Sequence, residues 1–382
     1  MISSPLALSA LVAGVAALAF WLDFRVPALS RIGASLLAIV FGATLSNAGL
    51  VPVASPVYDV VGGPVTSLAI AWLLLSVNLA DVKKAGPRML SAFTLALFGT
   101  ALGAFVGAFV FAGQLGEETW KLAGTFTGTY SGGGLNFVAV GRDLGLADSL
   151  FAGAAAADNL TTGLWLGATL LLPVWLKRFY PASDHDGGQV DAGPISVHDD
   201  HPFFLKRPLS TLDLAVLLAT GAGLVLAASA LATRVPVVPG VLWLTVLALM
   251  VGHLPPFRAP RGALQLGTVA LHLFFVVIGI HSRVSEIISV GVEVFLYTLV
   301  VVGVHGLVVY GVGRALKLDL GTLSVASQAA VGGPSSALAV AVSRGWRGLV
   351  LPGILVGLLG YAVGNFLGVA LGYLVRGAGV GL

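Results

Sequence analysis

The stretch Gly128–Gly141, GTYSGGGLNFVAVG, decides the fold, because three consecutive glycines interrupt a run of apolar residues. A second stretch, Ser327–Val340 or SQAAVGGPSSALAV, is interrupted in the same way by two glycines and a proline. Glycine and proline break helices. At membrane depth, broken backbone is tolerated only where it is buried in protein or lines a wet cavity. The two stretches predict broken segments inside a membrane domain.

Composition supports a membrane protein. Of the 382 residues, 57% are hydrophobic and 10% are charged, with a mean hydropathy of +0.98. Soluble domains carry about 25% charged residues, so a soluble globular enzyme is excluded. The absence of cysteine excludes disulfides, thiolate metal sites and cysteine nucleophiles. The formal charge of +3 indicates basic cytoplasmic loops rather than a nucleic-acid partner.

Ten apolar runs are long enough to cross a bilayer, which takes about 20 residues. They lie near 5–22, 32–51, 62–80, 89–113, 147–176, 210–232, 237–254, 264–281, 288–313 and 348–375. The first run lacks a basic flank and an evident cleavage site, so we expect a retained span rather than a signal peptide. The broken runs, 120–141 and 320–342, are counted separately.

The chain divides into two similar halves around one polar stretch. We expect a first repeat over 1–176, a solvated linker over 177–208 and a second repeat over 209–382. A shift of 200 residues matches five residues of the first half to identical ones: Gly132, Gly133, Ala139, Val140 and Gly145. We interpret the linker histidines, His185, His198 and His201, as part of a solvated loop rather than a metal site.

Charge counting favours one topology. If all twelve apolar segments cross, the 20 Lys and Arg residues split evenly between the two sides. If both broken segments enter and leave on the same side, 15 fall on one side, as the positive-inside rule prefers. We therefore predict an all-α polytopic membrane protein with about ten transmembrane helices and two glycine-broken re-entrant hairpins, in two inverted repeats. The linker is expected in the cytoplasm of a bacterial inner membrane, with both termini outside.

The broken tips are candidate solute-binding sites. Glycine leaves backbone groups accessible to a ligand, and half-helix ends carry partial charges. The candidate substrate-binding residues are Tyr130, Ser131, Gly132, Gly133, Gly134, Asn136, Gln328, Gly332, Gly333, Pro334, Ser335 and Ser336, with Ser327 beside them. The alternative is that the glycines are kinks that only serve helix packing.

A single carboxylate, Asp158, lies near the middle of an apolar span. A charge at this depth costs at least about 2.5–3.5 kcal/mol, so such residues usually mark ion sites or proton relays. Asn159, Thr161 and Thr162 add oxygen ligands within one turn, as a Na⁺ site needs. A proton carrier and a structural aspartate remain alternatives. Three more polar residues in apolar runs are interpreted as interface or core groups: Asn78, His281 and His305.

These motifs resemble a known family. GGGLNFVAVG followed by AADNLTTGLW, with GGPSSALAVAVSRGW and LVLPGILVGLLGYAVGN in the second half, are similar to the YjcL-like membrane proteins of domain of unknown function number 819. That family is grouped with inverted-repeat secondary transporters, including sodium:glutamate, 2-hydroxycarboxylate and bile-acid symporters and cation/proton antiporters. The resemblance implies a mobile core that holds the broken segments and a scaffold that often forms a homodimer. It also implies solute and Na⁺ binding at the tips. Asp158-Asn159 resembles the Asn-Asp pair of the antiporters in reversed order.

We therefore expect a secondary active transporter of a small anionic or zwitterionic solute, coupled to Na⁺ or H⁺ through Asp158. A cation/proton antiporter without an organic substrate is the alternative. Other classes fit less well. A membrane aspartyl protease needs two facing carboxylates, and the chain contains no GxxxxGK[ST] nucleotide loop. We expect no enzyme activity and no cofactor apart from a Na⁺ ion, with the solute and the lipid bilayer as partners.

Overall fold

The computed structural model describes residues 2, 4–26, 29, 34–181, 209–254, 262–281 and 284–381. Over these ranges all regular secondary structure is helical. Most of the predicted linker, including its three histidines, lies outside the described residues.

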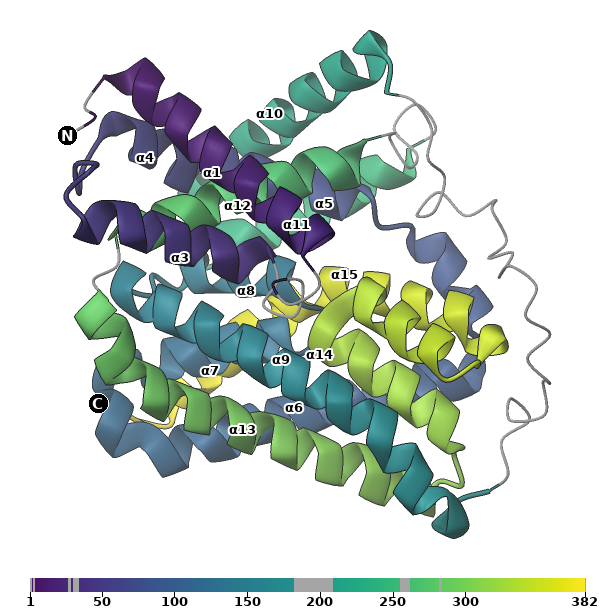
Figure 1. The fold of residues 1–382 in the computed structure, drawn as a ribbon. Helices are drawn as coiled ribbons and strands as arrows, with labels where there is room; N and C mark the ends of the chain where they lie inside the picture. Colours follow the sequence, from purple (N-terminus) through teal and green to yellow (C-terminus); the bar gives the residue numbers. More distant parts are fainter. Residues whose placement is uncertain are drawn as a thin grey trace.

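The predicted first repeat contains the helices α1 (Pro5–Arg25), α3 (Ala34–Asn47), α4 (Pro56–Val60), η1 (Val61–Val65), α5 (Thr66–Leu75), η2 (Leu79–Ala85), α6 (Gly86–Leu115), η3 (Gly116–Glu118), α7 (Thr119–Thr129), α8 (Gly134–Asp143) and α9 (Asp148–Leu176). The short helix η4 (Lys177–Phe179) begins the predicted linker. The predicted second repeat contains α10 (Thr211–Arg234), α11 (Gly240–His253), α12 (Ala263–His281), α13 (Val284–Ala315), α14 (Leu320–Ser343) and α15 (Arg347–Gly377). Figure 1 shows these helices running side by side.

The all-α polytopic fold is confirmed, and each predicted apolar run is occupied by helix. Nine helical stretches of the described chain are long and apolar enough to cross a membrane, while α3 and α11 have 14 residues each. One boundary differs from the prediction: the third run begins at Pro56 instead of near residue 62. The Ser55 hydroxyl caps that helix by accepting from the Val57 N–H. A π-helical turn then carries the chain through Gly62, Gly63 and Pro64.

The first broken segment is a re-entrant hairpin. Lys121 at the start of α7 donates to the Gly145 carbonyl just beyond α8, at 3.0 Å. A straight helix would separate these residues by roughly 36 Å, at a rise of ~1.5 Å per residue. The chain therefore enters along α7, reverses at the glycines and returns along α8.

The second broken segment, α14, reverses in the same way. A Cβ added to Gly321, near its start, would lie 3.3 Å from the Trp346 ring just beyond its end. The helix is interrupted at Gly333, whose φ of 77° and ψ of −170° are not helical. Gly133 has nearly the same conformation, with φ 108° and ψ −172°. The two reversals therefore occur at positions 200 residues apart, which supports the internal repeat.

The hairpins enter from opposite ends of the molecule, because α6 and α13, which lead into them, are antiparallel. Gly99 packs against His305, and Gly107 packs against Tyr297. Between them, a Cβ on Gly103 would lie 2.9 Å from the Cα of Val301. The glycines spaced by four in α6 therefore allow close helix packing, which drives association in lipid.

The helices gather into two bodies, each drawn from both repeats. The first body contains α1, α3, α4, η1, α5, α10, α11 and α12, and the second contains α6, α7, α8, α9, α13, α14 and α15. In Figure 1 the first body occupies the upper part of the view and the second the lower part. Both hairpins belong to the second body, and α8 borders the first.

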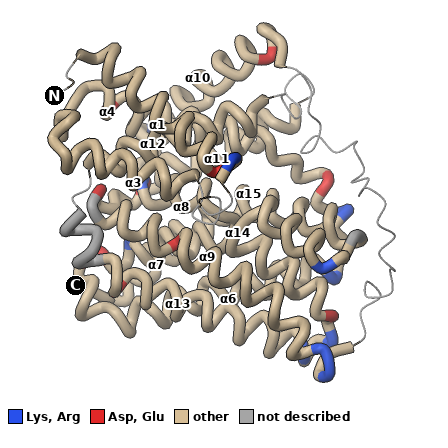
Figure 2. Tube along the Cα trace, in the orientation of Figure 1, with Lys and Arg blue, Asp and Glu red and all other residues tan. Residues whose placement is uncertain are grey.

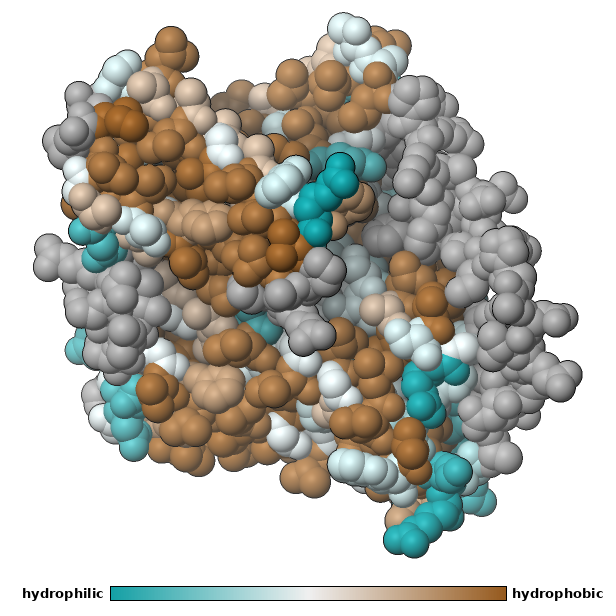
Figure 3. Space-filling view, in the orientation of Figure 1, coloured by the Kyte–Doolittle hydropathy of each residue, from teal (hydrophilic) through white to brown (hydrophobic). Residues whose placement is uncertain are grey.

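The visible face of the molecule is broadly hydrophobic (Figure 3). Large apolar side chains such as Phe24 and Leu307 are 81% and 77% exposed. A soluble protein rarely exposes so much apolar surface, whereas a lipid-facing one does. Lys and Arg gather at the end of the bundle where α9 ends (Figure 2), which is the side that the charge count assigned to the cytoplasm.

Candidate functional site

The two hairpin tips meet inside the second body. A Cβ added to Gly133 would lie 3.5 Å from the Cα of Gly333, and one added to Gly333 would lie 2.9 Å from the Gly132 carbonyl oxygen. Both glycines have positive φ, a conformation that L side chains rarely adopt. The backbone conformation favours glycine at both positions, and at Gly333 the close approach of the Gly132 carbonyl favours it as well. The predicted tip residues are therefore brought to one place from opposite ends.

The first tip is anchored to α15. The Asn136 amide donates to the Asn365 side chain at 3.1 Å and to the Tyr361 carbonyl at 3.2 Å. Asn365 in turn donates to Thr245 of α11 at 2.9 Å. All of these side chains except Tyr361 are fully buried. Asn136 therefore holds the tip against α15, and Asn365 connects it to the first body.

The second tip is anchored to α9. The Trp165 indole donates to the Ser327 hydroxyl at 2.9 Å, and the Thr169 hydroxyl donates to Gln328 at 3.3 Å. Pro334 packs against Gly357 of α15, and Ser336 lies against Gly332. Ser335 is exposed, unlike the buried Pro334 beside it. The first tip therefore contacts α15, the long helix that follows the second hairpin. The second tip contacts α9, which follows the first hairpin, and also α15.

Asp158 lies beside the first tip. Its Oδ2 is 3.4 Å from the Thr129 hydroxyl, and the hydroxyls of Tyr130 and Thr162 also face the carboxyl group. Thr129 and Tyr130 come from the hairpin, and Thr162 lies one turn further along α9. The carboxylate is thus surrounded by hydroxyl oxygens from two elements, and oxygen ligands are what hard cations prefer.

Two of the predicted ion-coupling residues do not contact Asp158. Asn159 donates to the Ala155 carbonyl of its own helix at 2.8 Å. Thr161 forms a hydrogen bond of 2.6 Å with Thr298 of α13 and faces the Tyr130 hydroxyl. Residues adjacent on a helix point in different directions, since successive side chains are about 100° apart. The structure therefore brings Thr162 to Asp158, but not Asn159 or Thr161.

Sequence reasoning missed a buried histidine network next to the tips. His305 contacts the Thr100 hydroxyl at 2.9 Å through Nδ1 and the Ser327 hydroxyl at 2.8 Å through Nε2. The Thr100 hydroxyl also donates to the Tyr130 carbonyl at 2.8 Å. His305 thus links the first tip to the second through two hydroxyl groups. A histidine in an apolar span was the available signal, but the sequence showed no partner for it.

Several polar atoms at the tips are buried without a hydrogen-bond partner within the described residues: Tyr130 Oη, Ser131 Oγ, Asn136 Oδ1, Asp158 Oδ1 and Gln328 Nε2. Leaving such an atom unpaired costs about 1–3 kcal/mol. The Tyr130 hydroxyl faces the Asp158 carboxyl group, and the other three atoms, of Ser131, Asn136 and Gln328, lie at the tips. Three unpaired atoms beside a buried carboxyl group favour a place that binds ions, water or a polar solute.

The other polar residues singled out in the sequence occupy structural positions. Asn78 accepts from the Ala80 N–H and donates to Asp81 at the start of η2. His281 donates from Nδ1 to Asp148 at 2.9 Å. Asp148 begins α9, and its side chain is 40% exposed. The hydrogen bond with His281 lowers the pKa of Asp148 below its usual 3.8. Burial opposes this shift, and the nearby charges of His281 and Arg142 add to it.

The re-entrant hairpins, the paired repeats and the buried carboxylate define an inverted-repeat membrane protein with a polar centre. A family profile described as "protein of unknown function (DUF819)" matches residues 10–378, so the chain belongs to this family. The chain is also 30% identical over 376 residues to the "Uncharacterized membrane protein YjcL" of Bacillus subtilis (strain 168), covering 94% of this chain and 93% of that protein. The resemblance seen in the sequence motifs is confirmed over nearly the whole chain.

Proposed function

We propose that this protein is a secondary active transporter that couples the movement of a small organic solute to Na⁺ or H⁺. The observation that carries the proposal is the buried carboxylate of Asp158 beside the broken tip of the first hairpin. Broken helices that meet near the membrane middle, in inverted repeats, are typical of secondary transporters. In this proposal the second body moves relative to the first, and the bacterial inner membrane is the expected location.

In this proposal the two binding roles belong to neighbouring groups. The carboxylate of Asp158, with the hydroxyls of Thr129, Tyr130 and Thr162, supplies oxygen ligands for a Na⁺ ion. The unpaired atoms of Ser131, Asn136 and Gln328 supply donors and acceptors for a polar solute at the meeting point of the tips. Because Tyr130 and Ser131 are consecutive, an ion at Asp158 and a solute at the tips would stabilise the same hairpin. That shared hairpin gives a physical basis for coupling.

Thermal stability in NaCl, with KCl as the control, tests the ion site in the purified protein. A ligand that binds only the folded state stabilises it by RT ln(1 + [L]/Kd). We expect NaCl to raise the melting temperature of the wild type and not of Asp158→Asn. If a pH-dependent shift replaces the Na⁺ response and disappears in the variant, the coupling ion is a proton.

A matched pair of variants sharpens the test. Thr162→Val removes a hydroxyl that faces Asp158, whereas Asn159→Leu removes an amide that bonds to the Ala155 carbonyl of its own helix. We expect only Thr162→Val to weaken the Na⁺ response, by about tenfold in apparent affinity for one lost ligand. Equal responses in the wild type, Asp158→Asn, Thr162→Val and Asn159→Leu would overturn the assignment of the ion site.

The tip residues separate a symporter from a cation/proton antiporter. In a symporter, Gln328→Leu should abolish solute-dependent Na⁺ uptake into proteoliposomes while leaving the stabilisation by NaCl intact. In an antiporter, ion exchange should depend on Asp158 and remain unchanged by Gln328→Leu. A channel would give flux that follows an imposed gradient of either sign without exchange or coupling.

A further inference from the structure

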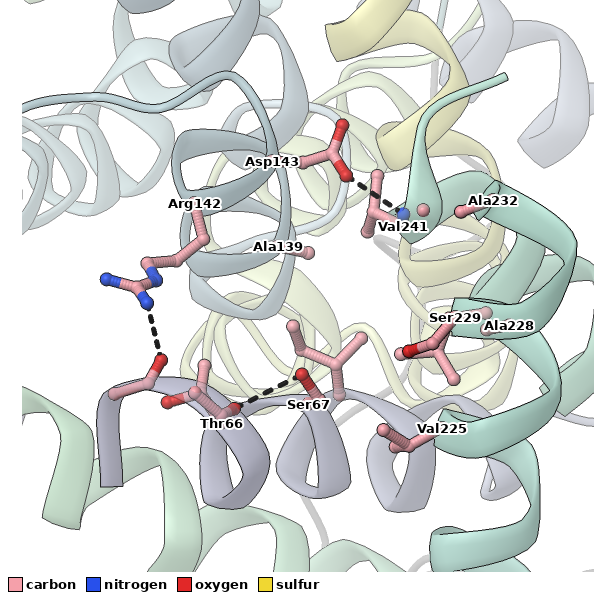
Figure 4. Close-up of a pocket in the computed structure, with 15 residues that line it drawn as sticks. Thr66, Ser67, Ala139, Arg142, Asp143, Val225, Ala228, Ser229, Ala232 and Val241 are labelled. Carbon is pink, nitrogen blue, oxygen red and sulfur yellow. Dashed lines mark hydrogen bonds between the residues drawn. The ribbon is translucent and has the colours of Figure 1, made fainter. Parts of the chain in front are cut away.

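A pocket of about 290 Å³ lies where the second body meets the first (Figure 4). Ala139, Arg142 and Asp143 of α8 form one wall, and η1, α5, α10 and α11 form the others. The pocket is separate from the Asp158 site, since Arg142 and Asp143 end α8 at the base of the hairpin. At ~1.5 Å per residue this end is roughly 13 Å from the tip glycines.

Two opposite charges lie side by side on the α8 wall and point in different directions (Figure 4). The Arg142 guanidinium donates to the Gly62 carbonyl at 2.6 Å, and Asp143 Oδ1 accepts from the Val241 N–H at 3.0 Å. Both hydrogen bonds cross from the second body to the first. The Arg142 guanidinium also lies 3.9 Å from Asp148 Oδ1, and because its side chain remains 38% exposed it can still donate to a ligand.

Two hydroxyl groups on the wall opposite α8, those of Thr66 and Ser67, can act only as hydrogen-bond acceptors toward a ligand. The Thr66 hydroxyl donates its proton to the Val61 carbonyl at 2.7 Å, and the Ser67 hydroxyl donates to the Gly63 carbonyl at 3.2 Å. A hydroxyl has one proton and two lone pairs, so these two oxygens offer only lone pairs to the pocket. Together with Asp143 they favour a ligand group that donates hydrogen bonds and carries positive charge.

The remaining lining is small or apolar. Ile70, Val225 and Leu244 supply branched side chains, and Gly62 and Gly63 leave space beside Arg142. A ligand that complements the cation of Arg142, the acceptor oxygens and the apolar lining needs three groups. It has a carboxylate for Arg142, an ammonium for Asp143 and the two hydroxyls, and a short apolar group. A molecule with a single charge would pair with only one of the two side chains.

We propose that this pocket binds a small zwitterion of the amino-acid type with an apolar side chain. It would hold the solute between the two bodies before the solute reaches the tips, and in that respect the inference rests on the proposed transport function. Because Arg142 and Asp143 also hold the bodies together, a bound carboxylate and ammonium would compete with the Gly62 and Val241 contacts and loosen the contact between the bodies.

Binding to the purified full-length protein tests the inference, with glycine, L-alanine and L-valine as probes in a thermal-shift titration. Two single-charged analogues of L-valine, isovalerate and isobutylamine, provide the chemical control. We expect at least one of the three zwitterions to raise the melting temperature and neither analogue to do so. Stabilisation by isovalerate or isobutylamine to the same extent, or by no zwitterion, would overturn the proposal.

Variants locate the binding. Arg142→Gln and Asp143→Asn should each weaken zwitterion binding by about 10- to 100-fold, as expected for the loss of a charge-assisted hydrogen bond. Asn at position 143 can still accept from the Val241 N–H, so that variant keeps the contact between bodies. Arg234→Gln removes an exposed charge from the end of α10 outside the pocket lining and should leave binding unchanged. Equal binding in all three variants would contradict the pocket.

A filling variant gives an independent readout. Ser229→Phe would place a ring in the pocket while leaving Arg142 and Asp143 unsubstituted, and it should abolish zwitterion binding. The response to NaCl should survive in Ser229→Phe and be lost in Asp158→Asn. If the wild type responds to NaCl but to no zwitterion, the proposal of zwitterion binding in the pocket is wrong and the proposed ion coupling still stands. If the wild type binds a zwitterion in the pocket but shows no Na⁺ or proton response, the proposed coupling mechanism is wrong and the pocket proposal still stands.

Discussion

Gly133 and Gly333, 200 positions apart in the chain, face one another where the two hairpins reverse. A Cβ on Gly133 would come within 3.5 Å of the Gly333 backbone, and both residues have positive φ. The two reversals are therefore packed against each other, so we expect a displacement of one tip to displace the other.

Alanine at either position should destabilise the protein. The backbone conformation of Gly133 is one that essentially only glycine adopts, at a cost of about 1–3 kcal/mol for other residues. Gly333→Ala should cost more than Gly133→Ala, since its Cβ would also approach the Gly132 carbonyl to 2.9 Å. Gly134→Ala is the control, because nothing lies within 4 Å of its Cβ. Melting temperatures measure all three, and an equal loss in Gly134→Ala would argue against the conformational explanation.

Asn365→Leu should destabilise the first tip by about 1–3 kcal/mol, because the buried Asn136 amide loses an acceptor. The Asn136→Leu variant should cost a similar amount. If the two residues act as a pair, the double variant should cost less than the sum of the single changes. Strict additivity in thermal or denaturant unfolding would show that the contact contributes little.

The Asp148–His281 contact should make stability sensitive to acid. The pKa of Asp148 is lowered in the folded protein, so the ionised carboxylate stabilises the fold above its usual pKa of 3.8. This contribution is lost as the pH falls through the lower folded pKa, so melting temperatures should decline between about pH 5 and pH 3. Asp148→Asn should make that decline shallower, and the exposed Asp59→Asn serves as the control. An unchanged acid profile in Asp148→Asn would mean that other groups account for it.

Single cysteines at Arg142 and Arg344 test the direction of the hairpins in the membrane. The chain has no cysteine of its own. Each position lies at the end of a hairpin's return arm, and the hairpins enter from opposite ends of the molecule. A membrane-impermeant thiol reagent should therefore label the two cysteines from opposite faces. Labelling of both from the same face would require that one broken segment crosses the bilayer.

The spans and hairpins could be predicted from the sequence because they depend on local composition. Long apolar runs specify helices in lipid, and the glycines at 132–134 and 332–333 mark the reversals. Side-chain partners could not be predicted. Thr161 and Thr162 were equivalent in the sequence, yet the rotation of α9 directs only Thr162 to Asp158. The contacts of His305 and the pocket beside Arg142 come from helices far apart in the chain, so no local pattern indicated them.

Each body contains helices from both halves of the chain, which bears on how such a protein could arise. A chain that contained only one half would lack the partners for its own hairpin, because Asn136 binds to α15 and Ser327 to α9. A single-repeat ancestor would therefore need a second copy inserted upside down in the same membrane. Dual insertion of one gene product, followed by duplication and fusion, supplies such a pair, and the matched reversals at Gly133 and Gly333 are what that history would leave behind.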